Sequence, residues 1–318
     1  MDLLRGIDSL GSREGPAIVT VGFFDGVHRG HRAVIGRTVA LAAELGLPSV
    51  AVTFDRHPRE VFAPGTEPRQ LTTPSRKAAL IAEIGIRTLV VLEFTEAFSR
   101  IPPDRFAKGI LVEGLRAEHV VVGANFTFGH RAEGTVDTLQ ELGSTLGFAA
   151  EGVPLLEIDG RVVSSTAIRQ ALADGDVGWP RLALGRRYAV EGRVGEGAGR
   201  GTALGWPTAN LDLPPKMLLP GTGVYAGTAT LGAGSWVAAI NVGTNPTFGV
   251  EPLHLEAFLL DFDRDIRGES MTVEFWARVS GEERYDSIEA LQRKIDDDVR
   301  RTREIVAAPG DAADAGSP

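Results

Sequence analysis

The chain has 318 residues, and 43% of them are apolar. Its mean hydropathy is +0.01 and its formal net charge is -9. This length fits about two domains, and no apolar run approaches the roughly 20 residues that span a bilayer. The acidic balance argues against a general nucleic-acid binder, and the lack of cysteine excludes disulfides and thiolate metal sites. We expect a cytoplasmic protein that acts on small molecules, without nucleic-acid or membrane partners, as a monomer or weak homo-oligomer.

The first half alternates short apolar runs with segments whose apolar residues recur at helical spacing. Such alternation predicts a Rossmann-like α/β domain, with a parallel sheet covered by helices on both faces. Ligands bind such sheets at the carboxyl ends of the strands, so chemistry is expected after Val21, Phe54 and Val122. The expected strands are 17–21, 49–54, 88–92 and 119–122, and the expected helices are 32–45, 75–84, 103–113 and 136–146.

From Tyr188 onward, β-rich runs separated by Gly, Pro and Asn predict a small antiparallel β-barrel. A C-terminal helix is expected over 287–306, with a capping box formed by Asp286 and Glu289. The expected barrel strands are 188–194, 224–230, 236–242, 253–260 and 271–279.

The predicted domains are residues 1–184, the α/β domain, and 185–306, the barrel with its helix. The tail over 307–318 is rich in Ala, Gly, Asp and Pro and is expected to be disordered. The acids Asp296, Asp297 and Asp298 are expected on a solvated face of the last helix, without a chemical role.

Lysine is scarce, at four residues, and none of the four follows a glycine. The chain therefore has no Walker A loop, and any ATP chemistry must use another phosphate cradle.

One such cradle is the segment 21–31 (VGFFDGVHRGH), which leaves the first strand and enters a helix. Its glycines allow close backbone approach, and the helix N-terminus favours an anion. His28 and His31 can face the same phosphate, which suits nucleotidyl transfer, where ATP is oriented and developing charge is neutralised. The alternative is a glycine-rich turn with two capping histidines. Residues of this segment expected to bind the nucleotide are Gly22, Phe23, Asp25, Gly26 and Gly30, with His28 and His31 as catalytic residues.

Two further stretches carry polar side chains near expected strand ends. Asn125 comes just beyond a strand, where its amide could contact a nucleotide. Residues 164–169 (SSTAIR) place hydroxyls at a helix start with Arg169 one turn in; ordinary N-capping is the alternative.

Taken together, GFFDGVHRGH, TFDRHPREVF, VVGANFTFGHRAEGT and SSTAIRQAL resemble, in this order, the adenylyltransferase domain of bifunctional riboflavin kinase/FAD synthetases. The resemblance implies that His28 and His31 contact the ATP phosphates and that Asn125 lies near the reacting groups. It also implies that an ATP site is closed by Ser164, Ser165, Thr166 and Arg169. The chain departs from the family at Asp55-Arg56, where Glu-Pro is common, at Ala124, where a charged residue is common, and at Ala167, where Arg is common.

A second candidate site begins with the glycine-rich segment 195–205. Trp206-Pro207 follows it instead of a helix, which argues against a dinucleotide-binding oxidoreductase. The N–H groups of the segment, including those of Gly199 and Gly201, could instead surround phosphates. Thr208 and Asn210 point the same way in an extended chain and could together hold Mg²⁺; a local Asx or Ser/Thr turn is the alternative.

Glu256 lies in an alternating run. Leu253, Leu255, Ala257 and Leu259 are expected on one face, and His254 and Glu256 on the other. A kinase acting on an alcohol needs a carboxylate to accept the hydroxyl proton, whereas a solvated strand glutamate is the alternative.

The segments GRGTALGWPTANL, GVYAG, NVGTNPTFG and LEAFLLDFDRDIRG resemble the riboflavin kinase barrel of the same family. This resemblance implies that Thr208 and Asn210 serve Mg·ATP and that Glu256 is the catalytic base. Ile266-Arg267-Gly268 stands where the family usually has Leu-Tyr-Gly. The implied function is phosphorylation of riboflavin to FMN, then adenylylation of FMN to FAD, with ATP as co-substrate and Mg²⁺ as cofactor. Alternatives are a chain in which only the kinase half works and a catalytically silent flavin-binding protein.

Overall fold

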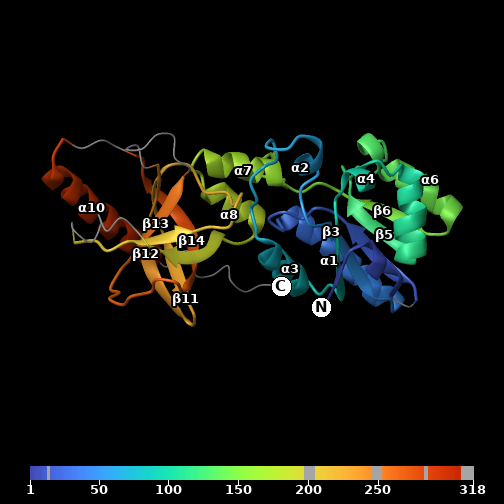
Figure 1. Cartoon of the computed structure of the whole chain (residues 1–318), viewed down its shortest axis with the longest axis horizontal. Coiled ribbons are helices and arrows are strands. Elements are labelled where there is room, and N and C mark those ends of the chain that lie inside the picture. Colours follow the sequence, from blue (N-terminus) through green and yellow to red (C-terminus); the bar gives the residue numbers. More distant parts are fainter. Residues whose placement is uncertain (13–14, 197–204, 245–252, 283–285, 309–318) are drawn as a thin grey trace. The chain divides into compact units, whose positions relative to one another are not determined.

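The computed structural model describes residues 1–12, 15–196, 205–244, 253–282 and 286–308. The chain folds into two compact units, Met1–Ser165 and Thr166–Pro318. Figure 1 colours the first unit from blue to green and the second from green to red. The predicted boundary after residue 184 remains a prediction.

The first unit is built on a six-stranded parallel sheet in the order β1-β4-β3-β2-β5-β6. Strands β2, β3 and β4 have the predicted bounds, and β5 extends the predicted strand at both ends. The edge strands β1 and β6 were not predicted, because neither DLLR nor AAEGV has the β-branched apolar run of the central strands. The strands are β1 Asp2–Arg5, β2 Ala17–Val21, β3 Ser49–Phe54, β4 Thr88–Leu92, β5 Ala117–Gly123 and β6 Ala149–Val153, and a small hairpin follows with β7 Glu157–Ile158 and β8 Arg161–Val162.

Helices cover both faces of this sheet, as predicted. On one face, Val19, Val52 and Val120 share a core cluster with residues of η2 and α6. On the other, Ala51 and Leu89 pack with residues of α1 and α3. The helices are η1 Ile7–Ser12, α1 Arg29–Leu45, α2 Arg59–Phe62, α3 Pro74–Glu83, α4 Glu96–Ser99, α5 Pro103–Phe106, η2 Ala107–Gly114 (a π-helix), η3 His130–Ala132 and α6 Val136–Leu146.

The second unit contains a closed antiparallel barrel in the order β10-β13-β12-β11-β14-β9. The barrel was predicted, but β10, which is only four residues long, was not. Alternate residues of β13 are buried, with Leu255, Ala257 and Leu259 inside. The prediction is wrong for Leu253, which precedes the strand and is 39% exposed. The elements are α7 Ser165–Ala173, α8 Gly178–Leu184, β9 Tyr188–Gly195, β10 Ala209–Asp212, β11 Gly223–Leu231, β12 Gly234–Gly243, β13 His254–Leu259, β14 Ser270–Ser280 and α10 Ile288–Ala307.

Helix α10 packs against β11, β12 and β14, beside the barrel in Figure 1. The predicted capping box is wrong: Ser287, in extended conformation, is the N-cap, and its hydroxyl accepts from Ala290 N–H. The solvated face predicted for three acids is also wrong for Asp298. This residue is 5% exposed, and its carboxylate accepts from Lys294 Nζ at 2.8 Å and Ser280 Oγ at 3.0 Å. Consecutive helical residues are about 100° apart, so a run of three cannot share one face. The predicted disordered tail lies outside the described residues apart from 307 and 308.

Candidate functional site

The turn between β2 and α1 places two histidines at the N-terminus of a 17-residue helix. His28 is the N-cap of α1, and its Nδ1 accepts from the His31 backbone N–H at 3.2 Å. A neutral imidazole that accepts at Nδ1 carries its hydrogen on Nε2, which makes Nε2 of His28 a donor. The two rings stack with 3.6 Å between centroids. The structure thus brings together the two histidines singled out from the sequence.

Gly22 and Gly30 of this turn lack a Cβ where the aromatic rings of Phe24 and His28 come close. A Cβ at Gly30 would lie 3.2 Å from Cε1 and Nδ1 of His28, and a Cβ at Gly22 would lie 2.6 Å from the Phe24 ring. Absence of a side chain at Gly30 therefore lets the His28 ring keep its place. That these glycines contact the nucleotide stays a prediction.

The backbone of the turn is strained. Phe24 has φ 54° and Val27 has φ 39°, both in the left-handed region, where a residue with a Cβ costs about 1–2 kcal/mol. Gly26, at φ 80°, adopts that region without the same cost. Strain of this kind persists where surrounding contacts enforce it, and it clusters at active sites.

Asp25 supplies some of those contacts from inside the protein. The residue is 3% exposed, and its carboxylate accepts from the backbone N–H groups of Leu71 at 3.0 Å and Thr72 at 3.2 Å. Thr72 Oγ1 in turn accepts from Gly26 N–H at 3.1 Å, and Ser165 Oγ donates to the Asp25 carbonyl at 2.9 Å. Asp25 was predicted to bind the nucleotide; the contacts of its carboxylate shape the turn.

Lys77, from α3, reaches the same turn and was missed by the sequence reasoning. Its Nζ donates to the Phe23 carbonyl and to Thr53 Oγ1, each at 3.1 Å, and the side chain is 8% exposed. A signal was present in the sequence, because Lys77 precedes the buried Leu80 and Ile81 by three and four residues. That spacing places it on the apolar stripe of the helix.

The hydroxyl segment falls at the division between the two units. Ser164 and Ser165 end the first unit; α7 begins at Ser165, and its residues Thr166 and Arg169 belong to the second unit. Thr166 is exposed and Arg169 is half-buried. Their predicted contribution to an ATP site stays a prediction.

Asn125 is exposed and lies in a turn just after β5. Because β5 pairs with β2, this turn and the histidine turn follow neighbouring strands of the sheet. Asn125 therefore lies at the edge where parallel sheets bind ligands.

A chain of phenylalanines follows the same edge and was not singled out from the sequence. Phe54 and Phe94 have ring centroids 5.4 Å apart, and Phe94 and Phe62 5.9 Å. Phe62 is 59% exposed, so its ring is accessible at this end of the chain of rings. The chain of rings runs through Phe62, Phe94, Phe54, Phe98, Phe106, Phe128 and Phe126.

The second site lies on the barrel. Thr208 Oγ1 donates to Glu256 Oε2 at 3.1 Å, across 48 residues of sequence. Asn210 of β10 pairs directly with Glu256 of β13, so their side chains share a face. That face is the outer one, because the inner positions of β13 are its buried apolar residues. The three residues predicted for this site are thus brought together.

Two further polar residues adjoin Glu256. His254 Nε2 lies 3.7 Å from Glu256 Oε1, and Asn241 of β12 pairs with Glu256 from its other side. The sequence showed that His254 shares the face of Glu256, whereas only the strand register reveals Asn241. The predicted phosphate-binding residues Gly199 and Gly201 lie outside the described residues.

Comparison with protein families assigns both units. A family model described as FAD synthetase matches residues 11–167, and one described as riboflavin kinase matches residues 184–306. A bifunctional riboflavin kinase/FMN adenylyltransferase from Pseudomonas fluorescens is 39% identical, over 96% of this chain and 98% of that protein. The protein of that name from Escherichia coli K12 is 35% identical, also over 96% of this chain and 98% of its own.

The chain belongs to the bifunctional riboflavin kinase/FMN adenylyltransferase family.

A solved structure from Streptococcus pneumoniae, described as a macrolide-efflux protein, also has this fold. Its TM-score is 0.85 at 28% identity, over 95% of this chain and 99% of that one. In the described part of this chain, no helix has the length and apolar character to cross a membrane.

The departures from the family pattern form contacts of their own. Asp55 accepts from Arg56 at 2.8 Å and from Phe94 N–H at 2.9 Å. Partial burial works to raise the pKa of Asp55, but these hydrogen bonds outweigh it and hold the pKa below its ordinary value. In the barrel unit, Ile266 is buried, and Arg267 is exposed and paired with Asp265.

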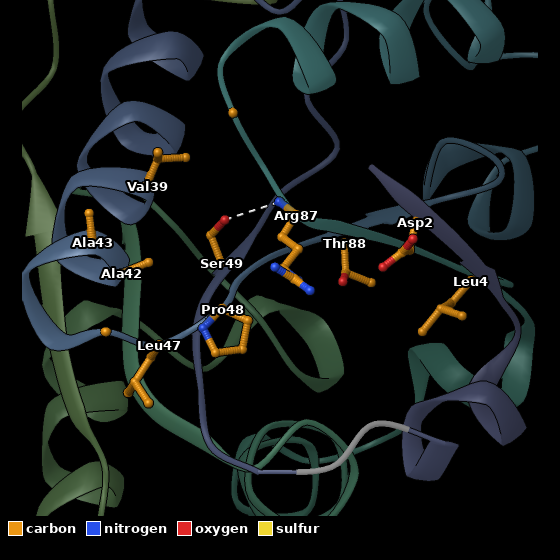
Figure 2. A pocket seen from close by; sticks show the side chains of 12 residues that line it. Asp2, Leu4, Val39, Ala42, Ala43, Leu47, Pro48, Ser49, Arg87 and Thr88 are labelled. Carbon is orange, nitrogen blue, oxygen red and sulfur yellow. Dashed lines mark hydrogen bonds between the residues drawn. The ribbon is translucent and has the colours of Figure 1, made fainter.

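A cavity of about 750 Å³ lies at the opposite edge of the sheet, where β3 and β4 begin. Figure 2 shows Arg87 near Pro48 and Thr88, with Asp2 next to Thr88, its partner in the pairing of β1 with β4. A strand of six residues spans roughly 17 Å, which separates this cavity from the carboxyl ends. Of the predicted site residues that the structure describes, none lines it.

Proposed function

We propose that the barrel unit phosphorylates riboflavin to FMN and that the α/β unit transfers AMP from a second ATP to FMN. The observation that carries the proposal is the pair of distinct polar sites in a chain of this family. One offers imidazoles at a helix N-terminus, and the other offers a carboxylate beside a hydroxyl and an amide.

In the kinase step, Glu256 accepts the proton of the ribityl 5'-hydroxyl. The hydroxyl oxygen bonds to the γ-phosphorus of ATP, the bond to the bridging oxygen breaks, and ADP leaves. The hydrogen bond from Thr208 orients the Glu256 carboxylate, and His254 lies against its other oxygen.

The donor set on this face fits Mg²⁺, because hydroxyl, amide and carboxylate oxygens are its preferred protein ligands. Thr208 and Asn210 are the residues that would hold the ion together with ATP. Bound there, Mg²⁺ would offset the negative charge of the ATP phosphates.

In the adenylyl step, an oxygen of the FMN phosphate bonds to the α-phosphorus of ATP and pyrophosphate leaves. The FMN phosphate is already a nucleophile, so the enzyme needs donors for developing charge rather than a covalent intermediate. His28 Nε2, His31 and the α1 N-terminus would supply them, with Asn125 at the next strand end.

The phenylalanine chain is proposed to receive the isoalloxazine ring of FMN. A flat aromatic ligand stacks on or against such rings, and each pair is worth about 0.5–1.5 kcal/mol beyond its buried area. Exposure of Phe62 supports this assignment, because its ring is available to a ligand. Phe62→Ala is expected to raise KM for FMN in the adenylyl step while leaving riboflavin phosphorylation unchanged.

The decisive experiment supplies the purified protein with riboflavin, ATP and Mg²⁺ and separates products by chromatography. FMN followed by FAD is the expected result, and absence of both would refute the proposal. Supplying FMN in place of riboflavin tests the α/β unit alone, and FMN without FAD would leave only the kinase half at work.

The proposal includes a cytoplasmic enzyme that works on free small molecules as a monomer or weak homo-oligomer. Both steps consume ATP, which is held in that compartment, and the net charge of -9 disfavours nucleic acid as a partner. Light scattering of the protein as it elutes from a size-exclusion column measures its molar mass. A stable large assembly would contradict the proposed monomer or weak homo-oligomer.

A further inference from the structure

The histidine turn of the first unit is clamped from one short segment, residues 71–77. Leu71 and Thr72 N–H groups hold the Asp25 carboxylate, and Thr72 Oγ1 holds Gly26 N–H. At the other end of the segment, Lys77 Nζ holds the Phe23 carbonyl. Each of the two strained residues of the turn, Phe24 and Val27, is a direct neighbour of a clamped position, 23, 25 or 26. The segment therefore contacts the turn close to each strained residue.

The Phe23 carbonyl is the point where this clamp meets the sheet. It accepts from Lys77 Nζ at 3.1 Å and from Thr53 Oγ1 at 3.0 Å, and Thr53 Oγ1 itself accepts from Lys77. Lys77 also lies 3.5 Å from the Phe54 carbonyl and 4.6 Å from the centroid of the Phe23 ring. One ammonium group thus joins the end of β3 to the start of the turn that follows β2.

We propose that Lys77 is a positioning residue for adenylyl transfer, whose charged ammonium group holds the β2–α1 turn in the conformation that stacks His28 on His31. This inference rests on the proposed function of the first unit. In this role Lys77 acts through the Phe23 carbonyl, to which its Nζ donates.

The charge state of Lys77 gives the clamp a pH dependence. Burial lowers the pKa of Lys77 to about 8, against the opposing effect of the carboxylates of Asp25, in the turn, and Asp55, after β3. His57 packs edge-on against the Phe23 ring, on which the ammonium also lies. Above this pH the amine has two hydrogens instead of three and no charge, so its bonds to three oxygen acceptors weaken.

The test compares Lys77→Met and Lys77→Arg with wild type in two assays, FMN to FAD and riboflavin to FMN. Met approximates the length of lysine without its donors, and Arg keeps a charge at every pH used. We expect Lys77→Met to lower kcat of the FAD step at least tenfold, with the FMN step within twofold of wild type. Lys108→Met is the matched control, because Lys108 is exposed and lies 3.8 Å from Glu113; it should leave both steps unchanged.

The second measurement is the pH profile of the FAD step from pH 6.5 to 9.5. Wild type should lose activity through about pH 8, and Lys77→Arg, whatever its maximal rate, should keep its own plateau to higher pH. Effects of substrate ionisation are common to both proteins and cancel in this comparison. If circular dichroism shows that Lys77→Met does not fold, the pH profiles of wild type and Lys77→Arg alone test the proposal.

Two results would overturn the proposal. One is a folded Lys77→Met protein with wild-type kcat for the FAD step; the other is the same alkaline limb in wild type and Lys77→Arg. A wild-type protein that makes no FAD from FMN at any pH would instead refute the proposed function of the first unit.

Discussion

The two candidate sites of this molecule are built on opposite principles. In the first unit, donors sit on a strained turn, and buried polar contacts away from the histidines hold the turn in place. In the barrel unit, Glu256 and Asn210 sit on paired strands whose register alone puts their side chains side by side. A site on regular strands needs little support, whereas a site on a strained turn depends on the groups beneath it. Changes away from the chemistry should therefore harm the FAD step more than the FMN step.

The largest expected effect is on the barrel site itself. Glu256→Gln keeps the shape and a hydrogen-bond acceptor for Thr208 but removes the proton acceptor, so kcat for FMN formation should fall about 10²–10⁴-fold. FAD formation from supplied FMN should be unchanged. Initial rates with each substrate check both, and equal loss of the two activities would contradict the division of labour.

On the other side of the comparison, His31→Ala removes one donor from the helix N-terminus. Loss of one such donor typically costs about 10²–10³-fold in kcat, so FAD formation should drop by this factor and FMN formation should not. Steady-state rates with FMN and with riboflavin measure it. If His31→Ala forms FAD at the wild-type rate, the imidazole pair has no role in adenylyl transfer.

The buried ammonium of Lys77, which supports the strained turn of the first unit, should also affect the pH dependence of the unfolding free energy. Its pKa is about 8 in the folded chain, against an ordinary value of 10.5, so between these pH values the unfolded chain binds more protons. Unfolding free energy should therefore rise with pH in this range, by up to about 3 kcal/mol relative to Lys77→Met. Activity of the FAD step is expected to fall over the same range, so the two quantities move in opposite directions.

Urea unfolding followed at 222 nm measures this stability difference. The four tryptophans, at 179, 206, 236 and 276, all belong to the second unit, so their fluorescence assigns the barrel transition separately. A difference between wild type and Lys77→Met that does not change with pH would show that Lys77 titrates normally.

A smaller effect is expected from Gly30→Ala. The added Cβ would come 3.2 Å from the His28 ring and displace it, and a misplacement of a few tenths of an ångström should cost about tenfold in the FAD step. Gly36→Ala in the same helix is the control, because nothing lies within 4 Å of that Cβ. It should preserve activity and stabilise the helix by about 0.5–1 kcal/mol. If both variants behave alike, the ring position does not matter.

The smallest effect belongs to His254→Ala. The ring lies 3.7 Å from a half-buried carboxylate, and pairs this exposed contribute about 0.2–1 kcal/mol, so kcat for FMN formation should change at most about fivefold. The FAD step serves as the internal reference. A change as large as that of Glu256→Gln would make His254 a second essential group of the kinase site.

Much of this architecture follows from local pattern. The central strands Ala17–Val21, Ser49–Phe54 and Thr88–Leu92 are mostly apolar runs, with only Ser and Thr as polar residues, which is typical of strands buried on both faces of a parallel sheet. Short strands such as Asp2–Arg5 and Ala209–Asp212 have no such run. Their pairing, to Thr88–Leu92 and to Glu256, forms only in the folded chain.

The sequence by itself determined the order of the two units, the glycine-rich histidine turn and the alternation that puts Glu256 on the outer barrel face. These features depend on neighbours within a few residues, where periodicity and turn chemistry are readable. The tertiary structure decided which polar groups are buried: Lys77 beneath the turn, Asp25 on Leu71 and Thr72, and Asp298 against Ser280. Burial of a charge depends on acceptors and donors 18 to 54 residues away, and no local pattern specifies those partners.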